Sequence, residues 1–206
     1  MPAWSPAERR ALARLRSPHD IQALIDTLDY SCDDFYRSPR RVLIDRRAHC
    51  VDGALLAAAA LRRQGHPPRI VWLHAVNDDG HLLAVFQQRS LWGAIAKSNF
   101  VGIRFREPVY RSLRELVMSY FNDYFNSQGQ RTMRAYARAL NLARFDHLDW
   151  ETRDDVLPPI VEDALDALTL IPIAPPAALR ALRPMDDRSL AAGMLGVSAK
   201  GLFKPS

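Results

Sequence analysis

The sequence predicts an α+β protein in which a buried helix packs on an antiparallel meander. Three observations carry this prediction. Apolar residues recur at helical spacing in residues 7–29, residues 50–64 form an alanine-rich run without proline, and residues 70–96 change to strand-like segments separated by polar turns. We therefore expect helices first, then a sheet that covers the alanine-rich helix.

The chain opens with two predicted amphipathic helices. Residues 7–16 and 20–29 both carry leucine or isoleucine three and four positions apart, and Ser17 or Asp20 can cap the second segment. Residues 30–49 are mostly polar and are interrupted by a proline. We expect that stretch to be a long connection.

Residues 50–64 (CVDGALLAAAALRRQ) give the strongest helix signal in the chain. Five alanines and three leucines occur there without proline, and Gly65 followed by two prolines provides a stop. So apolar a segment is expected to be largely buried.

The spacing then becomes strand-like. Residues 70–76 are β-branched and apolar, residues 77–80 are a polar turn, and residues 82–87 and 91–96 flank a second polar turn at 88–90. This pattern predicts a three-stranded antiparallel meander.

The remaining segments are less regular. Residues 111–125 return to helical spacing, residues 132–148 fit either a helix or a strand, and residues 153–168 favour a helix with two prolines at its start. Beyond residue 169 the composition shifts to proline and alanine. We therefore predict one domain over residues 1–170 and an extended C-terminal tail over 171–206 that packs on it.

Composition limits the class of protein. With 48% hydrophobic and 25% charged residues, a 206-residue chain can bury a core without disulfide or metal staples. The first residues are charged throughout, which argues against a signal peptide, and no apolar run reaches membrane-spanning length. We expect a cytoplasmic protein that does not bind a membrane.

The charge pattern does not favour nucleic-acid binding. Lys and Arg outnumber Asp and Glu by 28 to 23, but the arginines are scattered, and only residues 104–114 combine basic and aromatic side chains. We interpret that stretch as solvated surface and expect no nucleic-acid partner.

Cys50 is the strongest candidate for a catalytic residue. It lies in the first turn of the predicted helix, where backbone N–H groups and the helix dipole stabilise a thiolate. Cys32 lies in the polar connection and has no comparable setting. The plainer alternative is that Cys50 packs as a small apolar side chain. His81 opens the strand after the 77–80 turn, where an imidazole could reach the sulfur and act as a base.

The residue that would orient the imidazole depends on the hairpin register. A two-residue loop places Ser98 opposite His81, a three-residue loop places Asn99 there, and a third register places Lys97 there. Chemistry favours Asn99, because its amide oxygen can accept a hydrogen bond from the ring, and Ser98 is the alternative. A metal site is not expected, since His49 adjoins Cys50 without a second pair of ligands.

The order of these residues resembles a known family. A cysteine at a helix start (AHCVDGALLAAAALRRQGHPPRIVWL), a histidine on the next strand (DDGHLLAVF) and a polar residue on the strand after it (LWGAIAKSNF) resemble the transglutaminase-like superfamily, in particular an uncharacterised bacterial branch. The resemblance covers about residues 20–126. It implies a papain-like core with Cys50 as nucleophile and His81 as base. The family's usual aspartate on the next strand is missing here.

These features predict a cysteine-dependent acyl-transfer enzyme that forms a Cys50 thioester and needs no cofactor. We expect hydrolysis of a peptide, protein or small amide rather than crosslinking, because water is always available and nothing marks an amine-binding site. One alternative is a catalytically decayed member of the same fold that serves as a binding or scaffold module.

A third interpretation is a helical interaction protein that uses an aromatic surface. The residues concerned are Tyr120, Phe121, Tyr124 and Phe125. The oligomeric state is left open.

Overall fold

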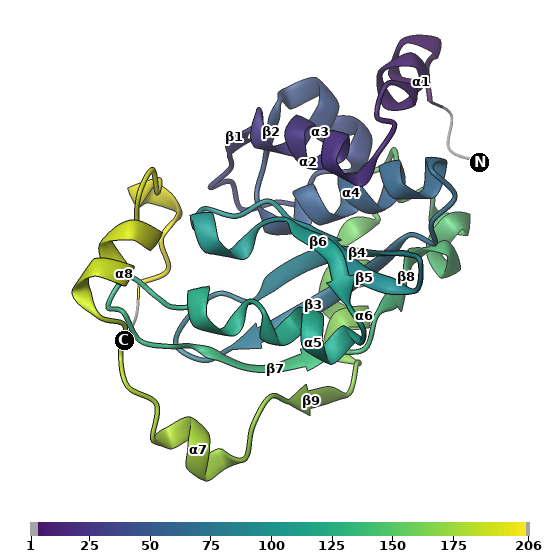
Figure 1. Ribbon diagram of the computed structural model, residues 1–206. Helices are drawn as coiled ribbons and strands as arrows, with labels where there is room; N and C mark the ends of the chain where they lie inside the picture. The colour runs from purple at the N-terminus through teal and green to yellow at the C-terminus, as the bar shows by residue number, and fades with distance from the viewer. Residues whose placement is uncertain (1–3, 205–206) are drawn as a thin grey trace.

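An antiparallel sheet separates two layers of helices in the computed structural model, which describes residues 4–204 (Figure 1). The strand order is β6-β5-β4-β3-β7-β9, and β8 pairs with one end of β3. The strands of this sheet are β3 (Arg69–Ala75), β4 (His81–Gln88), β5 (Leu91–Ile95), β6 (Arg106–Tyr110), β7 (Met133–Ala137), β8 (Leu140–Asn141) and β9 (Leu170–Pro172). The predicted α+β class is confirmed.

The helices surround this sheet. The α-helices are α1 (Pro6–Ala13), α2 (Pro18–Asp26), α3 (Pro39–Asp45), α4 (Cys50–Arg63), α5 (Leu113–Met118), α6 (Ala164–Asp166), α7 (Pro176–Arg180) and α8 (Asp187–Gly193). The 3-10 turns are η1 (Val101–Ile103), η2 (Phe121–Asp123), η3 (Leu142–Leu148) and η5 (Ala199–Gly201), and η4 (Pro159–Asp163) is a π-helical turn. None of the helices within residues 4–204 is long and apolar enough to cross a bilayer.

The two N-terminal helices form where the sequence predicts them. Ser17 accepts a hydrogen bond from the Asp20 N–H, and the Asp20 carboxylate accepts one from the Ser17 N–H, so both candidate residues take part in one capping box. An equivalent box on Ser5 and Glu8 starts α1.

The predicted long connection over residues 30–49 is wrong in part, because it contains α3. Ser38 caps this helix and Pro39 occupies its first position, where proline's missing N–H has no helical partner to lose. Two short strands, β1 (Asp29–Tyr30) and β2 (Arg47–Ala48), pair in parallel on either side of the connection.

Helix α4 is confirmed and is buried along most of its length. Every residue from Asp52 to Leu61 is buried, and α4 contacts β4 more than any other strand. Gly53 allows this close approach, since a Cβ there would lie 2.4 Å from the Cβ of Lys97.

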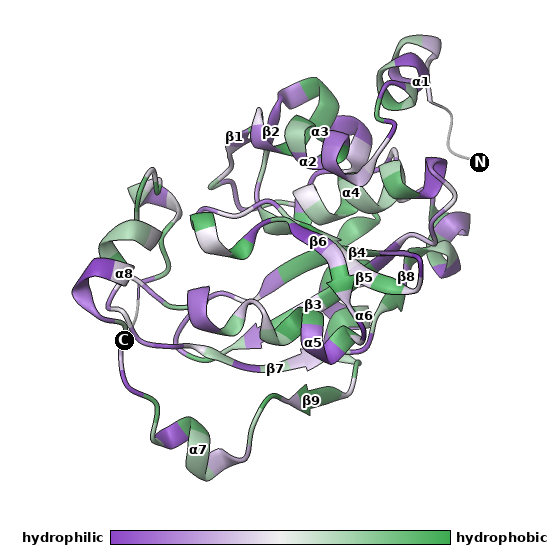
Figure 2. Ribbon diagram, viewed as in Figure 1, coloured by the Kyte–Doolittle hydropathy of each residue, from purple (hydrophilic) through white to green (hydrophobic). Residues whose placement is uncertain are grey.

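Strand β4 separates two hydrophobic cores. Its even-numbered residues Leu82, Ala84 and Phe86 face α4 and the N-terminal helices, whereas Leu83 and Val85 face α5 and η2. Figure 2 shows the central strands coloured mainly as hydrophobic, while the outer helices mix polar and apolar residues. Because both faces of β4 are buried, its sequence contains a continuous run of apolar residues.

The predicted meander is confirmed as β3, β4 and β5, and its hairpin fixes the register. Gln88 pairs with Leu91, so the loop is the two residues Arg89 and Ser90, both with positive φ as in a type I′ turn. This is the register that favoured Ser98 rather than Asn99. However, β5 ends at Ile95, before either residue could pair with His81.

Of three later segments, one needs correction, one was left open between helix and strand, and one forms a helix as expected. The helix expected over 111–125 is the short α5 followed by the turn η2, which lies between the buried residues Tyr120 and Tyr124. The ambiguous segment 132–148 forms strands β7 and β8 and then η3. The helix expected over 153–168 is confirmed over residues 157–166, with Pro158 and Pro159 in its first turn; its middle is the π-helical turn η4 and its end is α6.

The C-terminal part of the chain is more structured than the expected extended tail. Strand β9 joins the sheet beside β7, and α7 and α8 follow (Figure 1). The Met185 N–H donates to the carbonyl of Gly129, which ties this part to the body. The last described residues then reach the loops beside the N-terminal end of α4.

Candidate functional site

Cys50 occupies the first position of α4, and its neighbours explain why the helix starts there. His49 is the N-cap, and its Nδ1 accepts hydrogen bonds from the N–H groups of Val51 and Asp52 at 3.2 and 3.4 Å. The Asp52 carboxylate accepts a hydrogen bond from the His49 N–H in return. The histidine cap therefore uses donors that were expected to stabilise a thiolate.

Asp52 also anchors the loop that forms one wall of the site. Its carboxylate is fully buried, accepts a hydrogen bond from the Arg37 N–H at 2.7 Å, and lies 3.6 Å from the Arg37 guanidinium. Arg37 in turn pairs with Asp33 and Asp45. This buried cluster holds the loop between β1 and α3 against the start of the cysteine helix.

The Cys50 thiol lies beside the turn that precedes His81. Its Sγ is 3.9 Å from the carbonyl oxygen of Gly80, a distance at which a thiol can donate weakly. Gly80 has no room for a side chain, because a Cβ would lie 2.3 Å from Nε1 of Trp72. The Tyr124 hydroxyl donates to the carbonyl of Asp79 at 2.7 Å and holds the same turn from the other side.

His81 is buried on the opposite face of β4 from α4. Its Nε2 lies 2.9 Å from the carbonyl oxygen of Ile103, and its ring packs edge-on against Tyr124. Because a carbonyl only accepts, Nε2 carries the hydrogen and Nδ1 keeps a lone pair. His81 is therefore held in the tautomer whose Nδ1 can act as a base.

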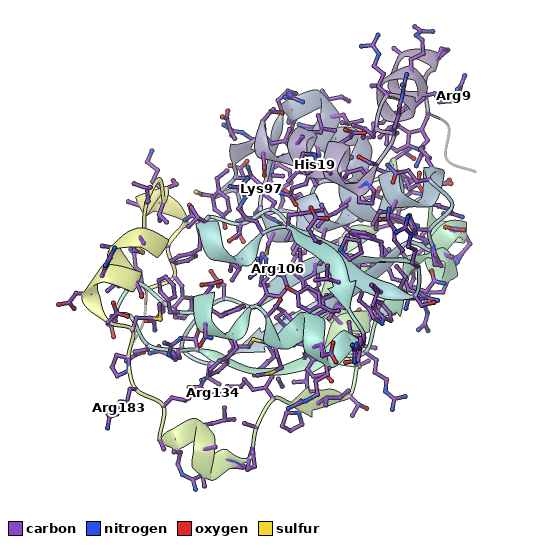
Figure 3. The ribbon with its side chains drawn as sticks, viewed as in Figure 1. Arg9, His19, Lys97, Arg106, Arg134 and Arg183 are labelled. Carbon is purple, nitrogen blue, oxygen red and sulfur yellow. The ribbon has the colours of Figure 1, made fainter. Side chains whose placement is uncertain are left out.

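The backbone carbonyl of Ile103 is a site component that the sequence did not reveal. The Arg106 guanidinium donates to the carbonyl of Gly102, and the Tyr120 hydroxyl donates to the carbonyl of Arg104, on either side of Ile103. Arg106, labelled in Figure 3, also lies 4.2 Å above the Tyr120 ring. Any residue type carries a carbonyl, so no sequence signal marks this one.

Two cavities meet at Cys50 and His81. The larger, of about 450 Å³, extends toward the loop after β1 and the C-terminal segment, and the smaller, of about 230 Å³, extends toward Trp72 and η4. Both are lined by Cys50, Gly80 and His81. The structure thus brings the two main sequence candidates to one place with space on two sides.

The candidates for the orienting group lie elsewhere. The Ser98 hydroxyl accepts a hydrogen bond from the Phe100 N–H, and the Asn99 amide bonds the backbone of Ser198 and Gly201. Lys97, labelled in Figure 3, donates to the carbonyls of Ile25 and Leu28 at the end of α2. Asn99 and Ser98 line the larger cavity, but it is the Ile103 carbonyl that holds the His81 ring.

Burial sets the protonation states of Cys50 and His81. Dehydration, with the carboxylates of Asp79 and Asp52 nearby, raises the pKa of the Cys50 thiol to about 11. Dehydration lowers the pKa of His81 to about 4, although its hydrogen bond to Ile103 acts in the opposite direction. At neutral pH the pair is thus a neutral thiol and a neutral imidazole, not the thiolate expected from the helix dipole.

The aromatic segment that suggested an interaction surface is mostly core. Tyr120, Tyr124 and Phe125 are buried, and Phe121 is half-buried against the same cluster. That interpretation is wrong for these side chains. Across the described part of the chain, no three His, Cys, Asp or Glu side chains converge as a metal ion would require.

A scan against protein-family models found no match for this chain, and a search of curated proteins found no similar sequence.

Proposed function

We propose that this protein is a cysteine-dependent acyl-transfer enzyme of the transglutaminase-like type that hydrolyses an amide or peptide bond. One observation carries the proposal: Cys50 at a helix start and His81 at a strand start line the same two cavities, on either side of Gly80. An acyl-transfer site needs space for the acyl group and for the leaving group, and two cavities at one thiol supply both.

The chemistry follows from the neutral pair. The Cys50 sulfur attacks the carbonyl carbon while the thiol proton passes to His81 Nδ1 through a water in the cavity that both side chains line, and the backbone N–H of Cys50 donates to the oxyanion. The protonated His81 then gives its proton to the leaving amine, which leaves a Cys50 thioester. Water, deprotonated by His81, attacks the thioester, releases the acid and restores the thiol.

The Ile103 carbonyl takes the role that Asn99 or Ser98 was expected to fill. Its hydrogen bond to Nε2 sets the tautomer, as a side-chain oxygen does in other cysteine–histidine sites. A carbonyl stabilises an imidazolium less than a carboxylate would, in line with the low pKa of His81. Proton transfer during the attack, rather than a preformed ion pair, is the mode that this site supports.

The test uses p-nitrophenyl acetate as a general acyl donor with the full chain carrying Cys32→Ser. We expect p-nitrophenolate release together with an acetyl group on Cys50, detected by mass spectrometry. His81→Gln should lower the acylation rate by about 100-fold or more, the usual contribution of a general base. No acetyl-Cys50 in a folded protein would refute the proposal.

The second candidate function is a binding or scaffold module on the same fold. It is favoured by the pKa of about 11 for Cys50, which leaves little thiolate at neutral pH. The rate of Cys50 alkylation against pH separates the two. Under the scaffold hypothesis the alkylation rate depends only on the ionisation of the Cys50 thiol and is the same in His81→Gln. If His81 acts as a base, the rate at neutral pH falls in His81→Gln.

A further inference from the structure

A segment of the same chain forms part of the wall of the larger cavity beside Cys50. Lys200, Gly201, Leu202 and Phe203 line it together with Cys50. These residues come more than a hundred positions after the cysteine helix and follow α8. A short stretch of main chain therefore lies next to the space in which a substrate for Cys50 would bind.

Asn99 holds this segment by its main chain. The Asn99 Nδ2 donates to the carbonyls of Ser198 at 2.9 Å and Gly201 at 3.2 Å, and its Oδ1 accepts from the Ser198 N–H at 2.8 Å. One side-chain amide thus satisfies two backbone acceptors and one backbone donor. Such contacts recognise a peptide backbone whatever its side chains are.

Gly201 makes the closest approach to the cavity wall. A Cβ at this position would lie 2.5 Å from the Tyr30 ring and 3.2 Å from Sγ of Cys32. By contrast, the side chains of Ala199 and Lys200 are exposed. The segment therefore packs closely only at Gly201 and is hydrogen-bonded by the Asn99 amide. It is not anchored by large buried side chains.

The charges around the cavity match this segment. Four aspartates line it: Asp33 pairs with Arg37 and Arg47, whereas within residues 4–204 Asp34, Asp78 and Asp79 have no cationic side chain within 4 Å. Lys200 on the segment is a cation at the same cavity. A basic peptide is favoured there over an acidic one.

We propose that the cavity beside Cys50 is a peptide-binding site in which Asn99 positions the peptide main chain, and that the displaceable segment 198–203, which forms part of the cavity wall, takes up part of the place of that peptide. The inference deepens the proposed function by naming a peptide backbone as the substrate class. It depends on that function only for the use made of Cys50, because peptide binding can be measured without catalysis.

The test measures binding of a fluorescent peptide with the sequence of residues 197–204 to the full chain by anisotropy. Gly201→Val should push the segment off the Tyr30 ring and bind the added peptide at least about tenfold more tightly than wild type, where the segment competes. Ala199→Val is the matched control, since its side chain is exposed and should leave binding at the wild-type level. Adding Asn99→Leu to Gly201→Val should abolish the gain.

A second measurement does not depend on peptide affinity. With Cys32→Ser in the background, Gly201→Val should raise the rate at which a bulky maleimide modifies Cys50, and Ala199→Val should not. Thermal unfolding checks that each variant is folded. Equal peptide binding by folded wild type and Gly201→Val, together with equal maleimide rates, would overturn the proposal. Peptide binding without acetyl-Cys50 in the ester assay would instead refute only the enzymatic function.

Discussion

At the scale of single residues, the site depends on burying two groups that titrate near neutrality in water. His81 is almost completely buried and is supported by a carbonyl instead of a carboxylate. Its imidazole is therefore neutral over the physiological range, and it resists protonation until the pH is well below the ordinary histidine value. The pKa of His81 can therefore be used to measure how far the site is shielded from water.

We predict that protonation of His81 destabilises the fold in acid. The pKa of His81 is about 4 in the folded protein against 6.5 for an ordinary histidine, so the unfolded chain binds the proton more readily. The stabilisation is complete above pH 6.5 and is lost as the pH falls toward 4, by an amount on the order of 3 kcal/mol. Urea unfolding of wild type and His81→Gln across this range measures it.

The comparison with His81→Gln is needed because a neighbouring group titrates in the opposite sense. Burial raises the pKa of Asp78 to about 6, so its contribution to stability is present in acid and is lost as the pH rises through that value. Asp78 is unchanged in both proteins, and its effect cancels in the difference. Parallel pH profiles for wild type and His81→Gln would contradict the dry environment assigned to His81.

The residues of the site were partly predictable from sequence. Cys50 and His81 were found because a thiol at a helix start and a histidine at a strand start are local patterns. The Ile103 carbonyl was missed because a backbone atom leaves no residue signature. Asn99 was selected for its chemistry at His81, yet its amide bonds the segment after α8, a contact that sequence spacing does not reveal.

At the scale of elements, the close fit of α4 on the sheet sets where Cys50 can lie. Gly53 is one turn after the cysteine and touches the backbone and Cβ of Lys97, just beyond β5. Lys97 in turn bonds the last carbonyls of α2. A single point of contact therefore links the cysteine helix, the sheet and the N-terminal helices.

We predict that Gly53→Ala destabilises the protein although alanine is the better helix former. The new Cβ would lie 2.4 Å from the Lys97 Cβ, and overpacking of this kind costs roughly 1–3 kcal/mol, more than the gain of about 1 kcal/mol in helix propensity. Chemical denaturation measures the difference. Lys97→Gly removes the opposing Cβ, so a double-mutant cycle should show the loss largely relieved; additive effects would argue against this contact.

Elements were predicted well where local periodicity decides them and poorly where packing does. Helix α4 and the meander follow patterns within a few residues of sequence. The π-helical turn η4 and the end of α5 at Met118 have no such local pattern. Helix α3 was missed because Pro39 was interpreted as a break when it begins the helix.

At the scale of the whole molecule, Glu151 connects distant parts of the chain. It is buried and accepts hydrogen bonds from Nε1 of Trp4 at 2.8 Å and from the Arg63 guanidinium at 2.9 Å. Its own backbone carbonyl accepts from the Arg40 N–H. Trp4, α3 and the end of α4 thus meet at one residue.

We predict that Glu151→Ala lowers the free energy of unfolding by about 2–4 kcal/mol. The change leaves the Trp4 indole N–H without its buried partner and removes the ion pair of partly exposed Arg63, which solvent screens in part. Asp155→Ala is the control, because its pair with Arg153 is exposed and should give no measurable change. Equal stability of the two variants in urea would contradict the role given to Glu151.

Strand β3 also determines the order in which the sheet can assemble. The segment that connects it to β4 is short, and the segment that connects it to its other neighbour, β7, is long. Its hairpin with β4 closes over residues 76–80, whereas its pairing with β7 closes over 76–132. Short loops close at a smaller entropic cost and therefore form earlier. The half of the sheet that carries His81 can thus fold against α4 from nearby contacts, and β7 and β9 add to a surface that already exists.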